Sequence, residues 1–260
     1  MYSNILWFSA ITLLLYLIFG LFLYLRQSHF LYFPTESVHV DEIHFEYFRS
    51  KDVEIKVWVA NPQGDQAIIY FGGNAEQVAE TALEYKQLFP NKAVYLLNYR
   101  GYAGSSGFPT ELGLKEDALT LFDRVAKKHQ NIDLIGRSIG SSMALHVAAR
   151  RTIRNCILVT PFDSILKLAQ QRFSFYPIKW LLRDKYESWI DAKNIDCSVL
   201  VIVAEEDRIV PRQSSDRLIA NLPANNLVVE ILPNAGHNRI EENGQYFNLL
   251  KEHLTGFKEN

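Results

Sequence analysis

The stretch IDLIGRSIG, residues 132–140, decides the fold that this sequence predicts. It begins with an apolar run over 132–135, and a helix-like segment follows it over 141–150. This order predicts a strand, a sharp turn with Ser138 at its apex, and a helix. Gly136 and Gly140 remove the Cβ atoms that would clash in so tight a bend. Because the helix begins directly behind Ser138, its N–H groups face the hydroxyl, an arrangement suited to attack on a carbonyl carbon and to stabilisation of an oxyanion.

Apolar runs alternate with amphipathic segments along the rest of the chain. Two segments that alternate apolar and polar residues, 43–48 and 53–60, predict half-exposed antiparallel strands at the start. Apolar or largely apolar runs predict buried strands at 67–71, 93–97, 132–135, 156–159, 199–204 and 227–232. Helical spacing predicts helices at 75–89, 112–129 and 240–254. The fold class is therefore α/β, with a mostly parallel central sheet that carries helices on both faces.

Composition limits the classes of function. The chain has 260 residues, 48% of them hydrophobic, which suits one domain of about 200–230 residues plus an additional segment. The net charge of −2 predicts no large basic surface for nucleic acid. Cys156 and Cys197 begin predicted core strands and are interpreted as small buried hydrophobic residues rather than a disulfide framework. The seven histidines are scattered and lack the spacing of a metal site, so no metal site is expected.

The N-terminus is the additional segment. Residues 5–25 carry no charge, and 21 helical residues cover about 31 Å, close to the hydrocarbon thickness of a bilayer. A cleavable signal peptide is the competing interpretation, but the basic leading region and the small-residue cleavage site are missing. We expect an uncleaved single-span anchor within residues 1–29, followed by one domain over 30–260. Arg26 favours a cytoplasmic domain only weakly, so the side of the membrane stays open.

An aromatic insertion interrupts the alternation between residues 162 and 191. Strand-end connections in such sheets lie over the ligand crevice, so the insertion is interpreted as a short helical lid that forms an apolar pocket. An ordinary helical excursion that packs its own aromatic residues is the alternative. The aromatic residues are Phe173, Phe175, Tyr176, Trp180, Tyr186 and Trp189.

The predicted strands at 199–204 and 227–232 are each followed by a candidate partner for Ser138. The first ends in Glu205, Glu206 and Asp207, and the second is followed by His237. Both strand ends lie at the sheet edge that carries the serine. We predict His237 as the general base and Asp207 as the acid that orients it, in the order Ser, Asp, His. The two glutamates are then solvated loop charges.

Three further assignments complete the predicted site. Asp163 is the alternative acid, because it follows the preceding strand. The oxyanion donors are expected to be the backbone N–H of Ile139 and that of Asn74, with Ala75 as the near alternative. The glycines before Asn74 allow close approach of the backbone to a substrate oxygen.

These motifs together resemble the α/β-hydrolase superfamily, and within it the membrane-anchored group related to the ABHD13 and Bem46 proteins. The matching stretches, collinear from about residue 30 to 255, are YFP (32–34), GGNA (72–75), YRGYAGSSG (99–107), GRSIG (136–140), TPFDS (160–164), DRIVP (207–211) and AGHN (235–238). The resemblance implies Ser138 as nucleophile, Asp207 as acid and His237 as base. One departure is Gly72, where that group usually has histidine, and it puts the rigidity of the turn in doubt.

The predicted function is cleavage of a carboxylic ester or thioester in an acyl lipid or another acylated substrate, such as an acylated protein, without a cofactor. A peptidase or amidase on the same fold is the first alternative, and an inactive anchored scaffold is the second. Arg100 is a candidate contact for an anionic head group. Acyl-chain length, the physiological substrate and the oligomeric state are left open by the sequence.

Overall fold

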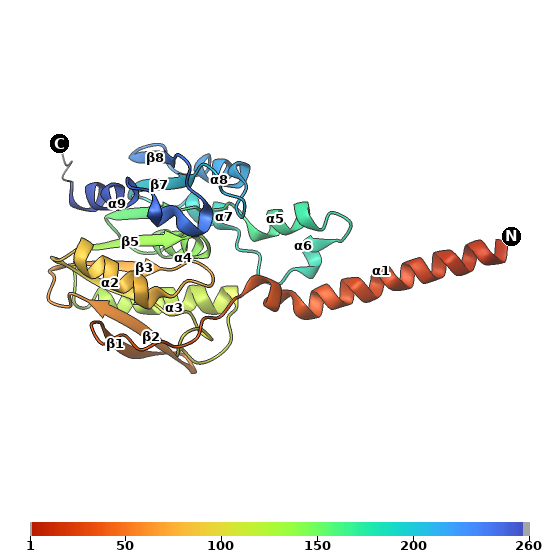
Figure 1. Ribbon diagram of the computed structural model, residues 1–260, viewed down its shortest axis with the longest axis horizontal. Coiled ribbons are helices and arrows are strands. Elements are labelled where there is room, and N and C mark those ends of the chain that lie inside the picture. Colours follow the sequence, from red (N-terminus) through yellow and green to blue (C-terminus); the bar gives the residue numbers. More distant parts are fainter. Residues whose placement is uncertain (1, 257–260) are drawn as a thin grey trace.

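The computed structural model describes residues 2–256, in which one central sheet is flanked by helices (Figure 1). Within these residues eight strands lie in the order β1-β2-β4-β3-β5-β6-β7-β8. β2 pairs antiparallel with β1 and β4, and all strands from β4 onward along the sheet are parallel. The strands are β1 (His44–Ser50), β2 (Val53–Ala60), β3 (Gln66–Phe71), β4 (Lys92–Leu97), β5 (Ile132–Arg137), β6 (Asn155–Val159), β7 (Ser198–Ala204) and β8 (Leu227–Leu232). The predicted mostly parallel sheet is confirmed.

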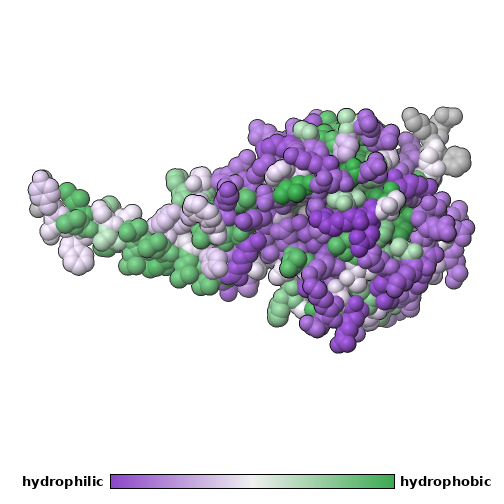
Figure 2. All heavy atoms as spheres, turned by 180° about the vertical axis from the view of Figure 1, so that it is seen from behind, coloured by the Kyte–Doolittle hydropathy of each residue, from purple (hydrophilic) through white to green (hydrophobic). Residues whose placement is uncertain are grey.

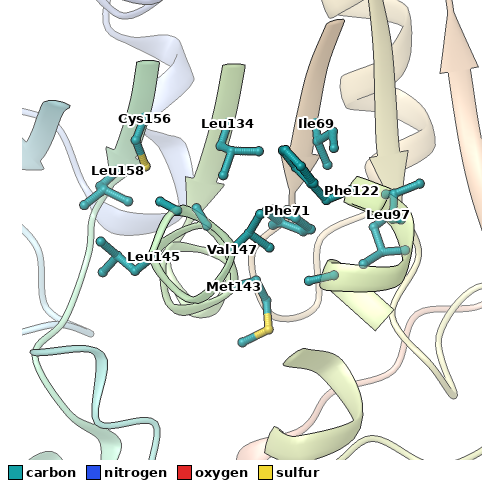
Figure 3. Close-up of a cluster of buried hydrophobic side chains, with 14 of the residues drawn as sticks. Ile69, Phe71, Leu97, Phe122, Leu134, Met143, Leu145, Val147, Cys156 and Leu158 are labelled. Carbon is teal, nitrogen blue, oxygen red and sulfur yellow. The ribbon is translucent and has the colours of Figure 1, made fainter. Parts of the chain in front are cut away.

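Helices cover both faces of this sheet. On one face α3 (Glu111–Val125), α4 (Ile139–Ala148) and α8 (Arg212–Ile219) share one buried apolar cluster with the strands. On the other face α2 (Val78–Leu88) and α9 (Tyr246–Thr255) share a second. Successive residues of β5 point to opposite faces, so Leu134 belongs to the first cluster and Ile135 to the second. Figure 3 shows Leu134 of β5 on the face of the sheet that α4 covers, together with Leu145 and Val147 of α4. The sheet is therefore sandwiched, which holds its carboxyl edge in place.

Four local predictions were wrong. The strand predicted as buried over 227–232, β8, lies at the edge of the sheet, and Leu232 is its one buried residue. β2 is buried from Ile55 to Ala60 rather than half-exposed, because it lies between two strands and under α2. Its Lys56 is buried with the ammonium 4.0 Å from the ring centre of Trp58, so the polar residue did not mark a solvent face. The helix predicted over 240–254 is two elements, the 3₁₀ helix η1 (His237–Glu242) and α9. The eight-residue α8 was not predicted.

Helix α1 (Tyr2–Leu31) leaves the domain as a long arm (Figure 1). Its 30 residues correspond to about 45 Å. Among the described residues it is the one helix long and apolar enough to cross a membrane. Figure 2 shows hydrophobic side chains along much of its length. The predicted span over 5–25 lies inside this helix, which continues to Leu31.

The insertion between β6 and β7 holds three short helices, α5 (Ile165–Arg172), α6 (Ile178–Leu181) and α7 (Ser188–Ala192). Figure 1 shows α5 and α6 beside the end of α1 that meets the domain. Both ends of the insertion are held to the domain. At its start the buried Asp163 accepts hydrogen bonds from Lys167 of α5 and from Arg217 and Ser214 of α8.

The other end of the insertion is held by two carboxylates. Glu111 at the start of α3 accepts hydrogen bonds from the N–H groups of Lys185 and Tyr186. Asp191 of α7 accepts from His146 of α4 and from Arg150, which follows α4, at 3.0 Å and 2.7 Å. The insertion is thus fixed at its base on three helices of the domain.

Candidate active site

Ser138 stands at the sharp turn between β5 and α4. Its backbone has φ 51° and ψ −116°, a left-handed conformation unusual for a residue with a side chain. Gly136 and Gly140 are required because no space is left for a side chain at either position. A Cβ on Gly140 would lie 2.0 Å from the carbonyl oxygen of Phe71, and one on Gly136 would lie 2.4 Å from that of Gly140. Glycine at positions 136 and 140 therefore lets the start of α4 lie directly against the backbone of β3. The resulting bend places the hydroxyl of Ser138 at the carboxyl edge of the sheet.

The imidazole of His237 joins the predicted residues. Its Nε2 lies 3.0 Å from Ser138 Oγ, and its Nδ1 lies 2.6 Å from Asp207 Oδ2. A carboxylate can only accept, so Nδ1–H donates to Asp207 and Nε2 is left to accept from the serine hydroxyl. The histidine follows β8 at the start of η1 and is 7% exposed, so these hydrogen bonds form in a site with little water. The three residues come from the ends of β5, β7 and β8.

Asp207 is held in one orientation by its own backbone turn. Its Oδ1 accepts hydrogen bonds from the N–H groups of Ile209 and Val210, at 2.9 Å and 2.8 Å. Its other oxygen is therefore the one that faces His237. Glu205 and Glu206 are exposed, as expected for solvated loop charges.

The alternative acid, Asp163, is engaged elsewhere. Its carboxylate is fully buried at the base of the insertion, among a serine, an arginine and a lysine. Burial by itself raises the pKa of Asp163, but the hydrogen bonds from Arg217, Ser214 and Lys167 outweigh it and lower that pKa. The carboxylate that contacts His237 is that of Asp207. The carboxylate of Asp163 instead holds the insertion to α8.

The turn after β3 lies opposite Ser138 and carries Asn74. Asn74, Ala75 and Ile139 line the same cavity as the serine hydroxyl. Within residues 2–256 the N–H groups of Asn74 and Ile139 have no hydrogen-bond acceptor, which leaves both available to a bound oxyanion. Ala75 has a left-handed φ of 62° that sharpens the turn.

The turn is held without the usual histidine. A Cβ on Gly72 would lie 2.5 Å from Val78 Cγ1, so a side chain of α2 fills the space where a larger residue would stand. The hydroxyl of Tyr99 donates to the Gly72 carbonyl at 2.7 Å, and Glu76 accepts from the N–H of Gly73 at 2.6 Å. The doubt that Gly72 raised about rigidity is answered by these contacts.

The side chain of Asn74 ties the turn to the chain that leaves α1. Its Nδ2 donates to the carbonyl of Leu31 at 2.6 Å, and its Oδ1 accepts from the N–H of Phe33 at 3.1 Å. The hydroxyl of Tyr102 donates to the same Oδ1 at 2.8 Å. The long N-terminal helix and the turn opposite Ser138 are thus hydrogen-bonded to each other.

Sequence reasoning missed the role of Arg137, the residue before Ser138. Its guanidinium donates to the carbonyl of His237 at 3.3 Å and pairs with Glu241 at 3.1 Å and with Glu76 at 3.7 Å. It therefore links the turn after β3, through Glu76, to the loop that carries the imidazole. The one signal in the sequence was a charged residue inside an otherwise apolar strand end.

The expectation for Arg100 was wrong. Its guanidinium binds the buried carboxylate of Asp117 on α3 through two hydrogen bonds of 2.7 Å. A bidentate partner of this kind uses the donors that an anionic head group would need. Arg100 therefore supports the loop before α3 and does not face the cavity over Ser138.

A cavity of about 510 Å³ lies over Ser138. Its polar end holds Glu76, Arg137 and Glu241. Its apolar wall comes from the chain after α1, from the insertion and from the turn after β7, through Leu31, Phe33, Phe162, Ile165, Leu168, Ile209 and Val210. Among the described residues, the six aromatic side chains singled out between 173 and 189 are not part of this wall, and Phe175 and Trp180 are instead exposed.

No cluster suited to a metal ion accompanies this cavity: across residues 2–256, no three or more His, Cys, Asp and Glu side chains are placed to hold one.

The strand order and the turn at Ser138 define the class of fold: the chain has the α/β-hydrolase fold. No protein-family model matches the chain. It is 31% identical to an uncharacterised protein of Mycobacterium tuberculosis over 179 residues, which are 66% of this chain and 63% of that protein. The chain thus spans less than two thirds of the length of this relative.

Two named relatives are more distant. The human α/β hydrolase domain-containing protein 17B is 28% identical over 207 residues, 75% of this chain and 68% of that protein. The Bos taurus lysophosphatidylserine lipase ABHD12 is 27% identical over 198 residues, 62% of this chain and 50% of the lipase. None of these relatives carries the name of the ABHD13 or Bem46 group, so that narrower resemblance stays a prediction.

The fold is also found among solved structures. The esterase Pf2001 of Pyrococcus furiosus aligns over 88% of this chain and 98% of its own, with a TM-score of 0.67 and 16% sequence identity. At that identity the likeness shows the fold alone.

Proposed function

We propose that the chain is a serine hydrolase that cleaves a carboxylic ester or thioester through an acyl-enzyme. The observation that carries the proposal is the position of the His237 ring, hydrogen-bonded to Ser138 at 3.0 Å and to Asp207 at 2.6 Å. A base between a hydroxyl and an orienting carboxylate is the arrangement that serine nucleophiles require. A relative named as a lipase supports hydrolytic chemistry.

In the proposed mechanism Ser138 Oγ attacks the carbonyl carbon while His237 Nε2 takes its proton. The new oxyanion accepts hydrogen bonds from the N–H groups of Ile139 and Asn74. Asp207 stabilises the imidazolium, which then gives its proton to the leaving alcohol or thiol as the carbon–oxygen or carbon–sulfur bond breaks. Water, deprotonated by the same imidazole, attacks the acyl-enzyme, and Ser138 recovers its proton as the acid leaves.

We further propose that α1 is an uncleaved membrane anchor and that residues 30–260 form the catalytic domain. The apolar wall of the cavity over Ser138 begins at Leu31, directly where α1 ends. An acyl lipid or another acylated molecule in or near the bilayer is therefore the proposed substrate. A polar end at Arg137 and Glu241 suits the leaving group or head group better than a second acyl chain.

A fluorophosphonate probe tests the proposed nucleophile in the full-length chain. Wild type is expected to be labelled, and Ser138→Ala is expected to lose labelling and ester hydrolysis together. Ser142→Ala, on the same helix, is the matched control and should keep both. Labelling that persists in Ser138→Ala would refute the assignment. Relative rates on p-nitrophenyl acyl esters and aminoacyl nitroanilides then rank ester against amide substrates.

A further inference from the structure

Helix α1 and the insertion form a second contact, away from the catalytic residues. The rings of Tyr16 and Tyr176 stack with centres 4.5 Å apart, and each hydroxyl donates to a backbone carbonyl of the other segment, Tyr176 to Tyr16 and Tyr16 to Phe175. Nearer the domain, the side-chain amide of Gln27 binds the backbone of Leu181 and Arg183. From residue 16 to residue 27 the contact follows α1 for about 16 Å.

This contact places the tip of the insertion at membrane depth. If α1 crosses the bilayer over residues 5–25, the level of Tyr16 lies about 13 Å inside the end at residue 25, within the hydrocarbon. The tip, residues 173–182, reads FSFYPIKWLL, with one charge. Its Phe175 and Trp180 are 86% and 83% exposed. Exposure of such apolar side chains to water is unfavourable, whereas contact with lipid acyl chains is favourable because both are apolar.

An apolar groove runs between the two segments. We call it the α1–α5 seam and define it by Leu23, Tyr24, Phe30, Ala169, Phe173 and Leu181, which line a hollow of about 70 Å³. The seam and the cavity over Ser138 are lined by neighbouring residues of the same two helices. Phe30 and Ala169 line the seam, while their chain neighbours Leu31 and Leu168 line the cavity. Helices α1 and α5 therefore contribute to both hollows.

We propose that the α1–α5 seam holds one hydrocarbon chain of a bilayer lipid and guides its ester to Ser138. The proposal rests on the proposed function and adds where the acyl group lies and from which phase it enters. A lipid chain is the occupant that the site favours, because the lining is apolar apart from Gln27, the outer end lies along the span of α1, and the residues next in the chain to Phe30 and Ala169 line the cavity over Ser138. The substrate then moves sideways out of the bilayer without passing through water.

Chain-length dependence in nanodiscs tests the seam. Ala169→Phe puts a ring into it, and Gln171→Phe puts the same ring on an exposed position of the same helix. We expect the ratio of kcat/KM for a 16-carbon ester to that for a 4-carbon ester to fall roughly tenfold in Ala169→Phe, since each excluded methylene costs about fourfold in affinity. The ratio should be unchanged in Gln171→Phe. An unchanged ratio in both variants overturns the proposal.

Quenching by lipids brominated on their acyl chains tests the membrane position without any catalysis. In a Trp7→Phe background, we expect fluorescence quenching that disappears when Trp180→Phe is added. Tyr47→Trp, on the exposed edge strand β1, should not restore it. An unquenched Trp180 overturns the inference even if ester hydrolysis is normal. If no ester is hydrolysed in a Ser138-dependent manner, the proposed function fails instead, and quenching alone decides whether the seam faces the bilayer.

Discussion

Replacing Asp207 by Asn isolates the part that the carboxylate plays in orienting His237. The two side chains have the same shape, and Asp207 Oδ1 accepts two backbone N–H groups, those of Ile209 and Val210. The amide oxygen of Asn must take this position, because an NH₂ group there would face two donors. The amide nitrogen then points at His237 Nδ1 and donates to it. This forces the proton of the imidazole onto Nε2, which can no longer accept the proton of Ser138.

The size of the effect follows from the cost of turning the amide over. Turning it loses two hydrogen bonds of about 1 kcal/mol each, so the reactive tautomer is populated at a few per cent at most. The neutral amide also stabilises the imidazolium less than a carboxylate does. Together we expect kcat to fall by about 10⁴-fold, the scale known for this change in serine proteases. The melting temperature should stay near that of wild type, because both backbone hydrogen bonds are kept.

The assay is hydrolysis of p-nitrophenyl butyrate by the full-length protein, measured from pH 6 to 9. Glu206→Gln is the control, since it makes the same acid-to-amide change at an exposed position one residue away. Its kcat should stay within about twofold of wild type, as expected for surface substitutions. Retention of more than a tenth of kcat in Asp207→Asn would refute this account and assign the orienting role to another group.

Three further changes test the supports of the site. Gly140→Ala forces a Cβ to 2.0 Å from the β3 backbone, so we expect a loss of about 3 kcal/mol in urea unfolding; a loss below about 1 kcal/mol would show that the turn adapts. Asn74→Ala removes three hydrogen bonds at the turn, and kcat should fall at least tenfold with KM little changed; a rise in KM alone would speak against oxyanion support. Burial alone raises the pKa of Asp191, but its partners His146 and Arg150 lower that pKa to about 2 from 3.8. This depressed pKa contributes about 2 kcal/mol above pH 4 and is lost as the pH falls toward 2. The stability gap to Asp191→Asn should close over that range, and a gap independent of pH would contradict the assignment.

Much of the fold could be predicted because its signals are local. The buried strands are continuous apolar runs, and the turn at Ser138 needs glycines that the sequence displays. Residues that follow successive parallel strands meet at the carboxyl edge of the sheet, so the sequence alone predicts that Asp207 and His237 lie together. The geometry brings all three side chains into contact, while their catalytic roles stay proposals.

The missed features depend on contacts between distant segments. Arg137 links the loop of His237 to Glu76, and Arg100 forms an ion pair with Asp117. Neither pairing can be predicted from the spacing of residues along the chain. The burial of β2 was hidden by Lys56, whose stem covers aromatic rings. The aromatic residues of the insertion were expected at the pocket, but Tyr176 contacts α1 instead. Residue periodicity within the insertion carries no information about a contact with so distant a segment.

The fixed base of the insertion has a kinetic consequence. Many lipases show interfacial activation, in which a flap swings aside only at a lipid surface and the rate jumps when the substrate aggregates. Here hydrogen bonds of Asp163, Glu111 and Asp191 hold both ends of the insertion to α8, α3 and α4, so we expect no such swing. For the proposed hydrolase, turnover of a soluble ester should therefore rise smoothly through its critical micelle concentration.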